Sequence, residues 1–486
     1  MNYKMIFNTL GKIFIILAFL MFVPIVVALI YNESIIPFLI PIIGLILIGM
    51  PLVLMRIKDK SLYAKEGFVI VALVWIVISL IGCTPFLISK TIPNFIDAFF
   101  ETVSGFSTTG ASVLNLSTTE ISLPKSIMFW RTFTHWIGGM GVLVLLLAIM
   151  PSDGNSMHLY RAEAPGPSAS KLVSKIRKTA TILYLIYLGL SVLMVLFLLI
   201  GKVNLYESLA IMFSTAGTGG FSVYGDSIAH YNSAYIDIVV SVFMLMFGLN
   251  FNVFYLILIG KFAKAFKSEE VLTYLIIILF STFAIAINIV NITGSFWLSL
   301  RYALFQTGAF ITTTGFVTAD FVNWPAFSQA ILLILSIIGA CGGSTGGGMK
   351  ISRMIILTKS SAKDIKQNLR ARSVNCIMYE NEPLDRSVER NVRTFLILWL
   401  AIVIVSTLLI SLDGFAKGDL YTNFATVITH IGNVGPAISK QIGSYGSFVG
   451  YNTFSKIILC LDMLIGRLEI FPIIILFTPR TWKRGK

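Results

Sequence analysis

The segment Phe310-Ile311-Thr312-Thr313-Thr314-Gly315-Phe316-Val317-Thr318 places hydroxyl side chains and one glycine between two apolar runs. Such a polar segment is unsuited to contact with lipid, where an unsatisfied polar group is costly. Three further segments share the pattern, and they are Ser107-Thr108-Thr109-Gly110, Thr218-Gly219-Gly220-Phe221 and Asn433-Val434-Gly435-Pro436. Successive glycines lie 110, 95 and 120 residues apart, which predicts four pseudo-repeated units around one pore. We call these segments loops 1 to 4, centred on Gly110, Gly220, Gly315 and Gly435.

The composition places these loops in a polytopic membrane protein. Of the 486 residues, 56% are hydrophobic and only 12% are charged, and the mean hydropathy is +0.86. A soluble protein of this length could not cover so much apolar surface. The net charge of +14 comes from basic residues in short loops between apolar runs, so it indicates membrane topology rather than nucleic-acid binding. The four cysteines are scattered without the spacing of a metal site or of a disulfide framework.

The chain divides into an N-terminal pair of spans and four units. Phe14–Tyr31 and Ile35–Leu54 each have about the 20 residues that a transmembrane helix needs. Behind them, a span, a short apolar segment, a polar loop and a return span recur four times. The expected parts are 1–66 for the N-terminal helices and 67–178, 179–268, 269–391 and 392–486 for the four pore units. We therefore expect an all-α membrane protein with four pseudo-repeated units around one pore.

The short apolar segments precede the loops. They are Pro93–Phe106, Leu205–Thr215, Trp297–Phe310 and Leu420–Ile431. With 11 to 14 residues they are too short to cross a bilayer, so we expect re-entrant half-helices that are buried in protein or line a watery cavity. The first helices of units 1 to 3 are expected near 67–88, 179–200 and 270–293, and that of unit 4 begins at about Arg393. The return spans are expected near 126–150 in unit 1, near 234–259 in unit 2, from Ala326 in unit 3 and near 453–477 in unit 4.

The distribution of basic residues predicts the orientation. If the N-terminus is cytoplasmic, the inner segments carry 28 of the 37 Lys and Arg residues and the outer segments carry 7. This bias places both termini in the cytoplasm. All four loops then enter the membrane from the outer side.

The loops have the chemistry of a cation filter. Glycine lets consecutive carbonyl oxygens turn toward one axis, where they can replace the water shell of an ion. Threonine hydroxyls add further oxygens, and each half-helix would direct its partly negative C-terminal end toward the cavity. A lone glycine in a membrane helix is more often a packing contact, as we expect for Gly138, Gly139 and Gly141. Four recurrences in the same context favour the filter.

The four loops resemble the filters of the Trk/Ktr/HKT superfamily of potassium transporters. The resemblance covers nearly the whole chain, and the two extra N-terminal spans are more similar to the bacterial TrkH branch than to KtrB. It implies a potassium filter made by Thr108, Thr109, Gly110, Thr218, Gly219, Gly220, Thr313, Thr314, Gly315, Asn433, Val434 and Gly435. In that family, glycine in all four loops accompanies potassium preference, and serine in the first loop accompanies sodium permeation. The residues after the glycines differ here, so we expect a less symmetric pore than that of a tetrameric channel.

A second glycine-rich segment interrupts the third return span. Cys341-Gly342-Gly343-Ser344-Thr345-Gly346-Gly347-Gly348-Met349-Lys350 lies between Ile331–Ala340 and Ile351–Leu357. Five glycines in ten residues cannot sustain a helix, since each costs about 1 kcal/mol relative to alanine. A phosphate loop is disfavoured because Met349 follows the last glycine where that motif needs lysine. The resemblance implies an intramembrane gating loop, made by Gly342, Gly343, Ser344, Thr345, Gly346, Gly347 and Gly348.

Arg467 lies within the last span, in Gly466-Arg467-Leu468-Glu469. A membrane-buried arginine is costly unless it is paired or faces water, so it is a candidate functional residue. A structural pair with Glu469 or Asp462 is one interpretation. The resemblance implies the other, an arginine beside the pore near the gating loop, and the two can coexist. Arg131 and His135 are expected near the outer interface or bound to neighbouring carbonyls.

The inner segment from Lys359 to Arg393 is rich in charge, which is typical of a solvated helical connector. The resemblance implies that it docks a cytosolic nucleotide-binding regulatory subunit of the TrkA or KtrA kind, and that the protein is a homodimer in the bacterial inner membrane. The chain has no nucleotide-binding fingerprint, so we expect no organic cofactor and only potassium as the permeant ligand.

Two other classes of function were weighed. A secondary transporter with broken helices would bind its substrate at the midplane, and should place several polar or charged residues deep in its spans, of which the sequence has few. An intramembrane enzyme would need paired carboxylates or grouped ligands. The four histidines, His135, His158, His230 and His430, are well separated, so no enzymatic site is expected.

Overall fold

The computed structural model describes residues 1–55, 64–114, 123–141, 176–369, 376–380, 382–415 and 419–482. In these parts the chain is almost entirely helical, and its one sheet is the antiparallel pair β1 (Met378–Tyr379) and β2 (Glu382–Pro383). The predicted all-α membrane architecture is confirmed. The end of the expected first return span (142–150) and the basic loops at 56–63 and 151–175 lie outside the described residues.

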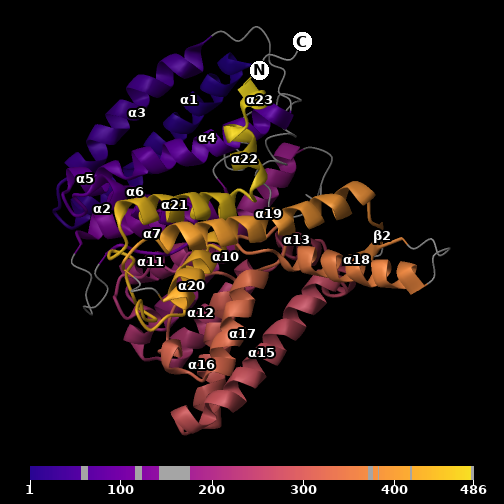
Figure 1. Ribbon diagram of the computed structural model, residues 1–486. Helices are drawn as coiled ribbons and strands as arrows, with labels where there is room; N and C mark the ends of the chain where they lie inside the picture. Colours follow the sequence, from indigo (N-terminus) through magenta and orange to yellow (C-terminus); the bar gives the residue numbers. More distant parts are fainter. Residues whose placement is uncertain are drawn as a thin grey trace.

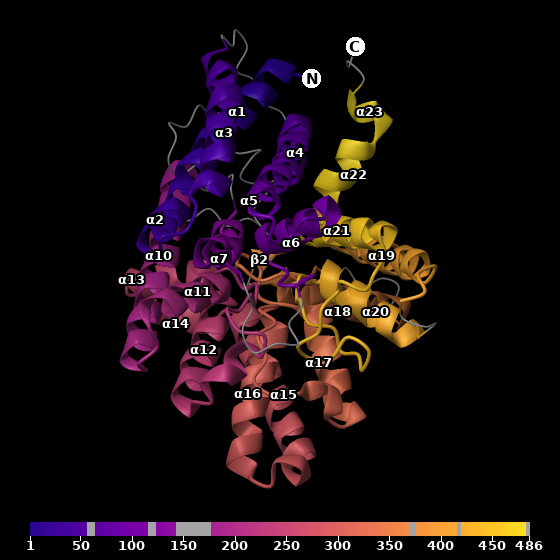
Figure 2. The same cartoon turned by 90° about the vertical axis from the view of Figure 1, so that its left-hand side faces the viewer.

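The N-terminal helices form a separate pair beside the pore units (Figures 1 and 2). They are α1 (Tyr3–Leu20), its continuation α2 (Phe22–Ile30), and α3 (Ile36–Leu54), so the first helix begins well before the expected Phe14. Gly11 and Gly49 allow α1 and α3 to touch, because a Cβ at Gly11 would lie 2.6 Å from Leu52 Cβ. The Glu33 carboxylate then accepts hydrogen bonds from the backbone N–H groups of Lys125 (2.7 Å) and Ser126 (2.9 Å). This contact attaches the pair to the first pore unit.

The four units follow in chain order. Unit 1 contains α4 (Ala64–Gly82), α5 (Thr84–Ile88), α6 (Phe95–Phe106) and α7 (Lys125–Gly139). Unit 2 contains α10 (Ile176–Ile200), α11 (Leu205–Ala216), η1 (Ser227–Tyr231), α12 (Ala234–Phe247), α13 (Phe251–Leu258) and α14 (Phe262–Phe266). Unit 3 contains α15 (Glu269–Thr293), α16 (Phe296–Ile311), η2 (Phe321–Asn323), α17 (Ala326–Ile338) and α18 (Ile351–Leu369). Unit 4 contains α19 (Arg386–Ile410), α20 (Leu420–Ile431), α21 (Thr453–Arg467), α22 (Phe471–Phe477) and the short α23 (Pro479–Trp482).

The predicted half-helices are α6, α11, α16 and α20, with 12, 12, 16 and 12 residues. Polar side chains fix where three of them begin, because Asn94, Asn204 and Asp419 each accept hydrogen bonds from backbone N–H groups of the first turn. Such caps satisfy donors that have no partner within the helix. The half-helices therefore begin at sequence-encoded caps and end at the loops.

Two return helices are broken where the sequence predicted continuous spans. The span expected near 234–259 consists of α12 and α13, which meet at 92° around Gly248–Asn250. The span expected near 453–477 breaks between α21 and α22, where Glu469 and Ile470 have φ of 57° and 72°. In the described residues, six helices are long and apolar enough to cross a membrane, or seven if the bent pair counts as one span.

The physical reason for the first break is a hydrogen-bonding partner that the local sequence does not reveal. The carbonyls of Phe247 and Gly248, freed by the bend, accept N–H groups from Thr345 (3.4 Å) and Cys341 (3.1 Å). An interrupted helix is tolerated at membrane depth only when such groups find partners. The glycine-rich segment of unit 3 therefore supports the bend in unit 2.

Candidate functional site

Each half-helix ends in the same backbone turn. Each loop has three predicted filter residues, and the first of the three has a positive φ. The values are 56° at Thr108, 55° at Thr218, 57° at Thr313 and 54° at Asn433. In each loop this residue donates its N–H to the carbonyl three residues earlier, and the next residue donates to the carbonyl five residues before it, with all distances between 2.8 and 3.2 Å. This pattern terminates a helix and satisfies its last carbonyls. The four loops thus share one conformation although their sequences differ.

The loops touch one another in chain order and close into a ring. Each loop glycine lies against a carbonyl of the next loop, as the position of an added Cβ reveals. That atom would lie 1.8 Å from Gly219 O at Gly110, 2.1 Å from Thr314 O at Gly220, 2.0 Å from Val434 O at Gly315, and 2.6 Å from Thr109 O at Gly435. These glycines also have φ of 79°, 76°, 74° and 100°, a region that L-residues with side chains rarely adopt. Loop 4 returns to loop 1, so the ring is closed.

The structure brings all twelve predicted filter residues into this ring. It is further held by hydroxyl pairs within loops 1 and 3, where Ser107 and Thr109 are 2.7 Å apart and Thr312 and Thr314 are 2.7 Å apart. Across the junction of loops 4 and 1, Asn433 Nδ2 donates to Thr109 Oγ1 (2.9 Å). The described residues contain no group of three or more His, Cys, Asp or Glu side chains that could hold a metal ion. The ring instead offers carbonyl and hydroxyl oxygens, which suit a weakly held cation.

The glycine-rich segment lies directly against this ring. It runs from the end of α17 at Ile338 to the start of α18 at Ile351, as the sequence predicts. Its later part touches two loops, because Gly347 N–H donates to Thr313 Oγ1 (2.6 Å) and a Cβ at Gly347 would lie 2.4 Å from Gly432 O. A side chain at Gly346 would likewise meet Thr312 O at 2.8 Å. Only residues without side chains fit here.

The earlier part of the segment is bound by other elements. The segment donates to the carbonyls at the α12–α13 bend, as described above. In addition, Gly343 O accepts the Phe251 N–H (3.1 Å). Gly342 N–H donates to the buried carboxylate of Glu270 on α15 (2.6 Å). Glu380, between β1 and β2, accepts the Ser268 hydroxyl (2.7 Å) and the Glu270 N–H (3.1 Å). The segment is therefore linked through α15 to the β1–β2 hairpin.

Arg467 occupies the gap between the glycine-rich segment and α7. Its Nη1 donates to Thr345 O (2.7 Å), and its Nη2 donates to Gly138 O and to Gly139 O (2.7 Å). Of the two carboxylates considered as its partners, Glu469 forms an ion pair with Arg353, and Asp462 accepts the Ser406 hydroxyl (2.7 Å). The interpretation that places the arginine near the glycine-rich segment agrees with these contacts.

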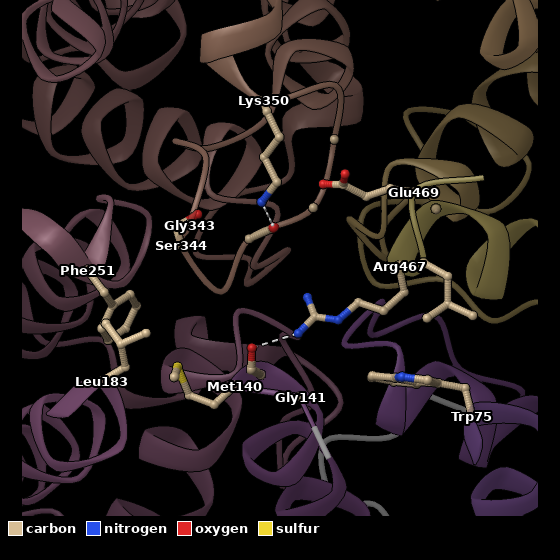
Figure 3. A pocket seen from close by; sticks show the side chains of 16 residues that line it. Trp75, Met140, Gly141, Leu183, Phe251, Gly343, Ser344, Lys350, Arg467 and Glu469 are labelled. Carbon is tan, nitrogen blue, oxygen red and sulfur yellow. Dashed lines mark hydrogen bonds between the residues drawn. The ribbon is translucent and has the colours of Figure 1, made fainter. Parts of the chain in front are cut away.

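Arg467 and Lys350 both reach into a pocket beneath the segment (Figure 3). Its walls come from α4, α7, α10, α13 and α21 and from Gly343 to Gly348. Lys350 is 2% exposed and donates from Nζ to Gly346 O. Lys350 is one of the 28 basic residues that the orientation prediction assigns to the inner segments. Its position directly after the glycine run was the signal that it belongs to the site.

Arg131 and His135 lie in the protein interior. Arg131 is 2% exposed and His135 is fully buried on α7. Arg131 binds the Ser222 carbonyl (3.1 Å), as one interpretation expected, and also pairs with Glu101 (2.6 Å). Sequence analysis missed Glu101 as a partner, although a carboxylate in a 12-residue apolar half-helix required one.

Comparison with known proteins agrees with this architecture. The family profile TrkH, described as cation transport protein, matches residues 37–484. The chain is 34% identical to the Trk system potassium uptake protein TrkH of Escherichia coli K12, over 99% of this chain and all of that protein. It is 31% identical to TrkH of Halomonas elongata over the full length of both.

A solved structure has the same fold. The crystal structure of the potassium transporter TrkH from Vibrio parahaemolyticus matches with a TM-score of 0.87 and 31% identity, covering 99% of this chain and 100% of that chain. The family comprises transport proteins rather than enzymes. The chain belongs to the TrkH family of cation transport proteins.

Proposed function

We propose that this protein takes up potassium ions through the closed ring of loops 1 to 4. The observation that carries the proposal is the ring itself, in which four equivalent turns each place one carbonyl against the glycine of the neighbouring loop in cyclic order, namely those of Thr109, Gly219, Thr314 and Val434. Carbonyl oxygens at the C-terminal ends of four half-helices favour a cation and can replace its hydration shell. The relatives described as potassium uptake proteins support potassium as the ion.

In this proposal the ion meets a gate after the filter. Gly342 to Gly348 obstruct the path beneath the ring, and Arg467 holds them through Thr345 O. The positive charges of Arg467 and Lys350 beside the same pocket raise the energy of a cation there. Opening requires the segment to leave loops 3 and 4, which few side chains oppose because five of its seven residues are glycine.

The proposed surroundings follow the sequence expectations. The protein would lie in the bacterial inner membrane, in contact with lipid, as a homodimer with both termini in the cytoplasm. The start of α1 and the last described helix, α23, lie at the same end of the molecule in Figures 1 and 2, which supports a common side for the two termini. A cytosolic nucleotide-binding subunit of the TrkA kind would act on the inner end of α18, the β1–β2 hairpin and the start of α19. The division into units at 67–178, 179–268, 269–391 and 392–486 is part of the proposal.

Ion flux into vesicles tests the proposed function. The purified protein in liposomes should take up rubidium, and external potassium should compete far better than sodium. Saturable uptake of an organic solute with no cation flux would contradict the proposal and favour a secondary transporter with broken helices.

A further inference from the structure

Glu101 and Arg131 form an ion pair behind the ring, between the outward-leading parts of loops 1 and 2. Arg131 Nε lies 2.6 Å from Glu101 Oε1, and the two side chains are 2% and 0% exposed. We propose that this pair is a positioning device that sets the ion selectivity of the pore by fixing loops 1 and 2 relative to each other. The inference deepens the proposed function and rests on it.

Glu101 holds loop 1. It lies on α6, and its carboxylate accepts the Ser112 hydroxyl (2.9 and 3.1 Å) and the Val113 N–H (2.9 Å). These residues lie two and three positions after Gly110 in the chain. A displacement of the carboxylate would therefore move the loop at its filter glycine.

Arg131 holds loop 2. From α7 it donates Nη1 to Ser222 O (3.1 Å), and its guanidinium lies 3.6 Å from the centre of the Phe221 ring. His135, one turn further along α7, stacks on the same ring at 4.2 Å. A Cβ at Gly219 would lie 2.4 Å from His135 Nδ1. Loop 2 is thus packed closely against α7.

At the other junctions of the ring, the described loop residues form hydrogen bonds but no ion pair, although one carboxylate takes part, since Asp320 accepts the Ser444 hydroxyl (2.6 Å). Val317 N–H donates to Ser227 Oγ (3.2 Å) between loops 3 and 2, Val322 N–H to Ser444 Oγ (3.3 Å) between the segments after loops 3 and 4, and Phe448 N–H to Ser112 O (2.9 Å) between the segments after loops 4 and 1. At the position of Glu101, five residues before the end of each half-helix, the other units carry Ile211, Gln306 and Thr426. A carboxylate at this position is therefore special to unit 1.

This asymmetry gives the ion pair its effect on selectivity. Discrimination between potassium and sodium depends on where the carbonyl oxygens lie and how far they can move. Buried charge pairs hold geometry strongly, because each partner left alone is a costly buried charge. The junction between loops 1 and 2 is then the rigid side of the ring, and the remaining junctions are more compliant.

Two neutralising variants test the inference with opposite charge effects. Glu101→Gln leaves an unpaired cation near the pore and should lower total cation flux, whereas Arg131→Gln leaves an anion and should not. Both should lower the potassium-to-sodium permeability ratio by about fivefold to tenfold, the size expected from losing one charge-assisted contact. The double variant should lower the ratio no further than either single change, since both remove the same contact.

Asp97→Asn is the matched control. Asp97 lies one turn before Glu101 on α6 and pairs with Lys456 (2.6 Å), away from the residues that hold loops 1 and 2. It should retain the wild-type ratio. The melting temperature of each variant in detergent separates a loss of fold from a loss of selectivity.

Arg131→Lys covers the case in which the neutral variants do not fold. It keeps the charge but lacks the planar fork that reaches Glu101 and Ser222 together, so it should lower the ratio with little change in flux. The inference would be overturned if Arg131→Lys, or the neutral variants that fold, kept the wild-type ratio. It would also be overturned if Asp97→Asn lowered the ratio as much as they do. A wild-type protein without potassium preference would instead refute the proposed function.

Discussion

The ring of loops and the glycine-rich segment are both rich in glycine, yet they are held in different ways. The ring repeats one backbone turn four times, and its contacts run from each loop to the next. The glycine-rich segment occurs once, and its contacts reach out to α12, α13, α15 and α21. A repeated structure supported by itself suits a filter that must keep its shape. A single segment that is held by hydrogen bonds to several separate helices, and whose glycines bring no side chains to pack, suits a gate.

The glycines illustrate the same difference. In the ring, glycine is needed because the next loop's carbonyl occupies the place of a side chain. In the glycine-rich segment, Gly346 and Gly347 are needed for contact with the ring, whereas Gly343 is needed for its φ of 72°, and its Cβ position lies 3.2 Å from Asn250 Oδ1. Substitutions should therefore harm selectivity in the ring and gating in the segment.

The largest effect is expected for Gly110→Ser. The new Cβ would overlap Gly219 O, and the φ of 79° disfavours a side chain, so two loops must shift. The potassium-to-sodium ratio should fall by at least about tenfold, which corresponds to about 1.4 kcal/mol of lost discrimination. Flux under defined gradients measures it. Gly189→Ser in α10, where no atom lies within 4 Å of an added Cβ, should leave the ratio unchanged, and an unaltered ratio in Gly110→Ser would refute the filter assignment.

Arg467→Ala should affect the gate instead. It removes the donor to Thr345 O and a positive charge beside the pocket, and both changes favour cation passage. We expect flux to rise by about fivefold to tenfold, as the loss of one or two charge-assisted hydrogen bonds would produce, with the selectivity ratio retained. Shortening Gly342–Gly348 should act in the same direction. If neither change altered flux, the segment would not be the gate.

A smaller effect is expected for Glu270→Gln. The amide can still accept the Gly342 N–H, but a neutral acceptor binds more weakly than a carboxylate. Rubidium uptake should rise about twofold to threefold, the effect of losing part of one hydrogen bond. Glu269→Gln serves as the control, because the half-exposed Glu269 pairs with Lys359 rather than with the segment. Equal uptake by wild type and Glu270→Gln would remove α15 from the support of the gate.

Much of this arrangement could be predicted because it is encoded locally. The half-helices follow from apolar length and from caps such as Asn94 and Asn204, and the break after Ile338 follows from the glycines themselves. The equivalence of the four loops follows from their recurrence. Each of these features depends on residues that are close in the sequence.

The remaining features depend on partners far along the chain. The bend at Gly248 requires the backbone N–H groups of Cys341 and Thr345 as partners for the freed carbonyl oxygens. The break at Glu469 does have a local mark, Pro472 at the start of α22, but the length of the apolar run favoured a continuous span. Lys350 looks like an ordinary basic residue of an inner loop until the structure buries it beside Gly346. Tertiary contacts of this kind override the local pattern, so composition and periodicity cannot reveal them.

The central claim is that the permeating ion is coordinated by the ring. A crystal structure with thallium or rubidium in place of potassium, located by anomalous scattering, tests it most directly. The account predicts ion density on the axis between Thr109, Gly219, Thr314 and Val434, at coordination distance from their carbonyl oxygens. Ion density confined to the pocket beside Lys350 and Arg467 or between the broken helices, with the ring empty, would contradict it.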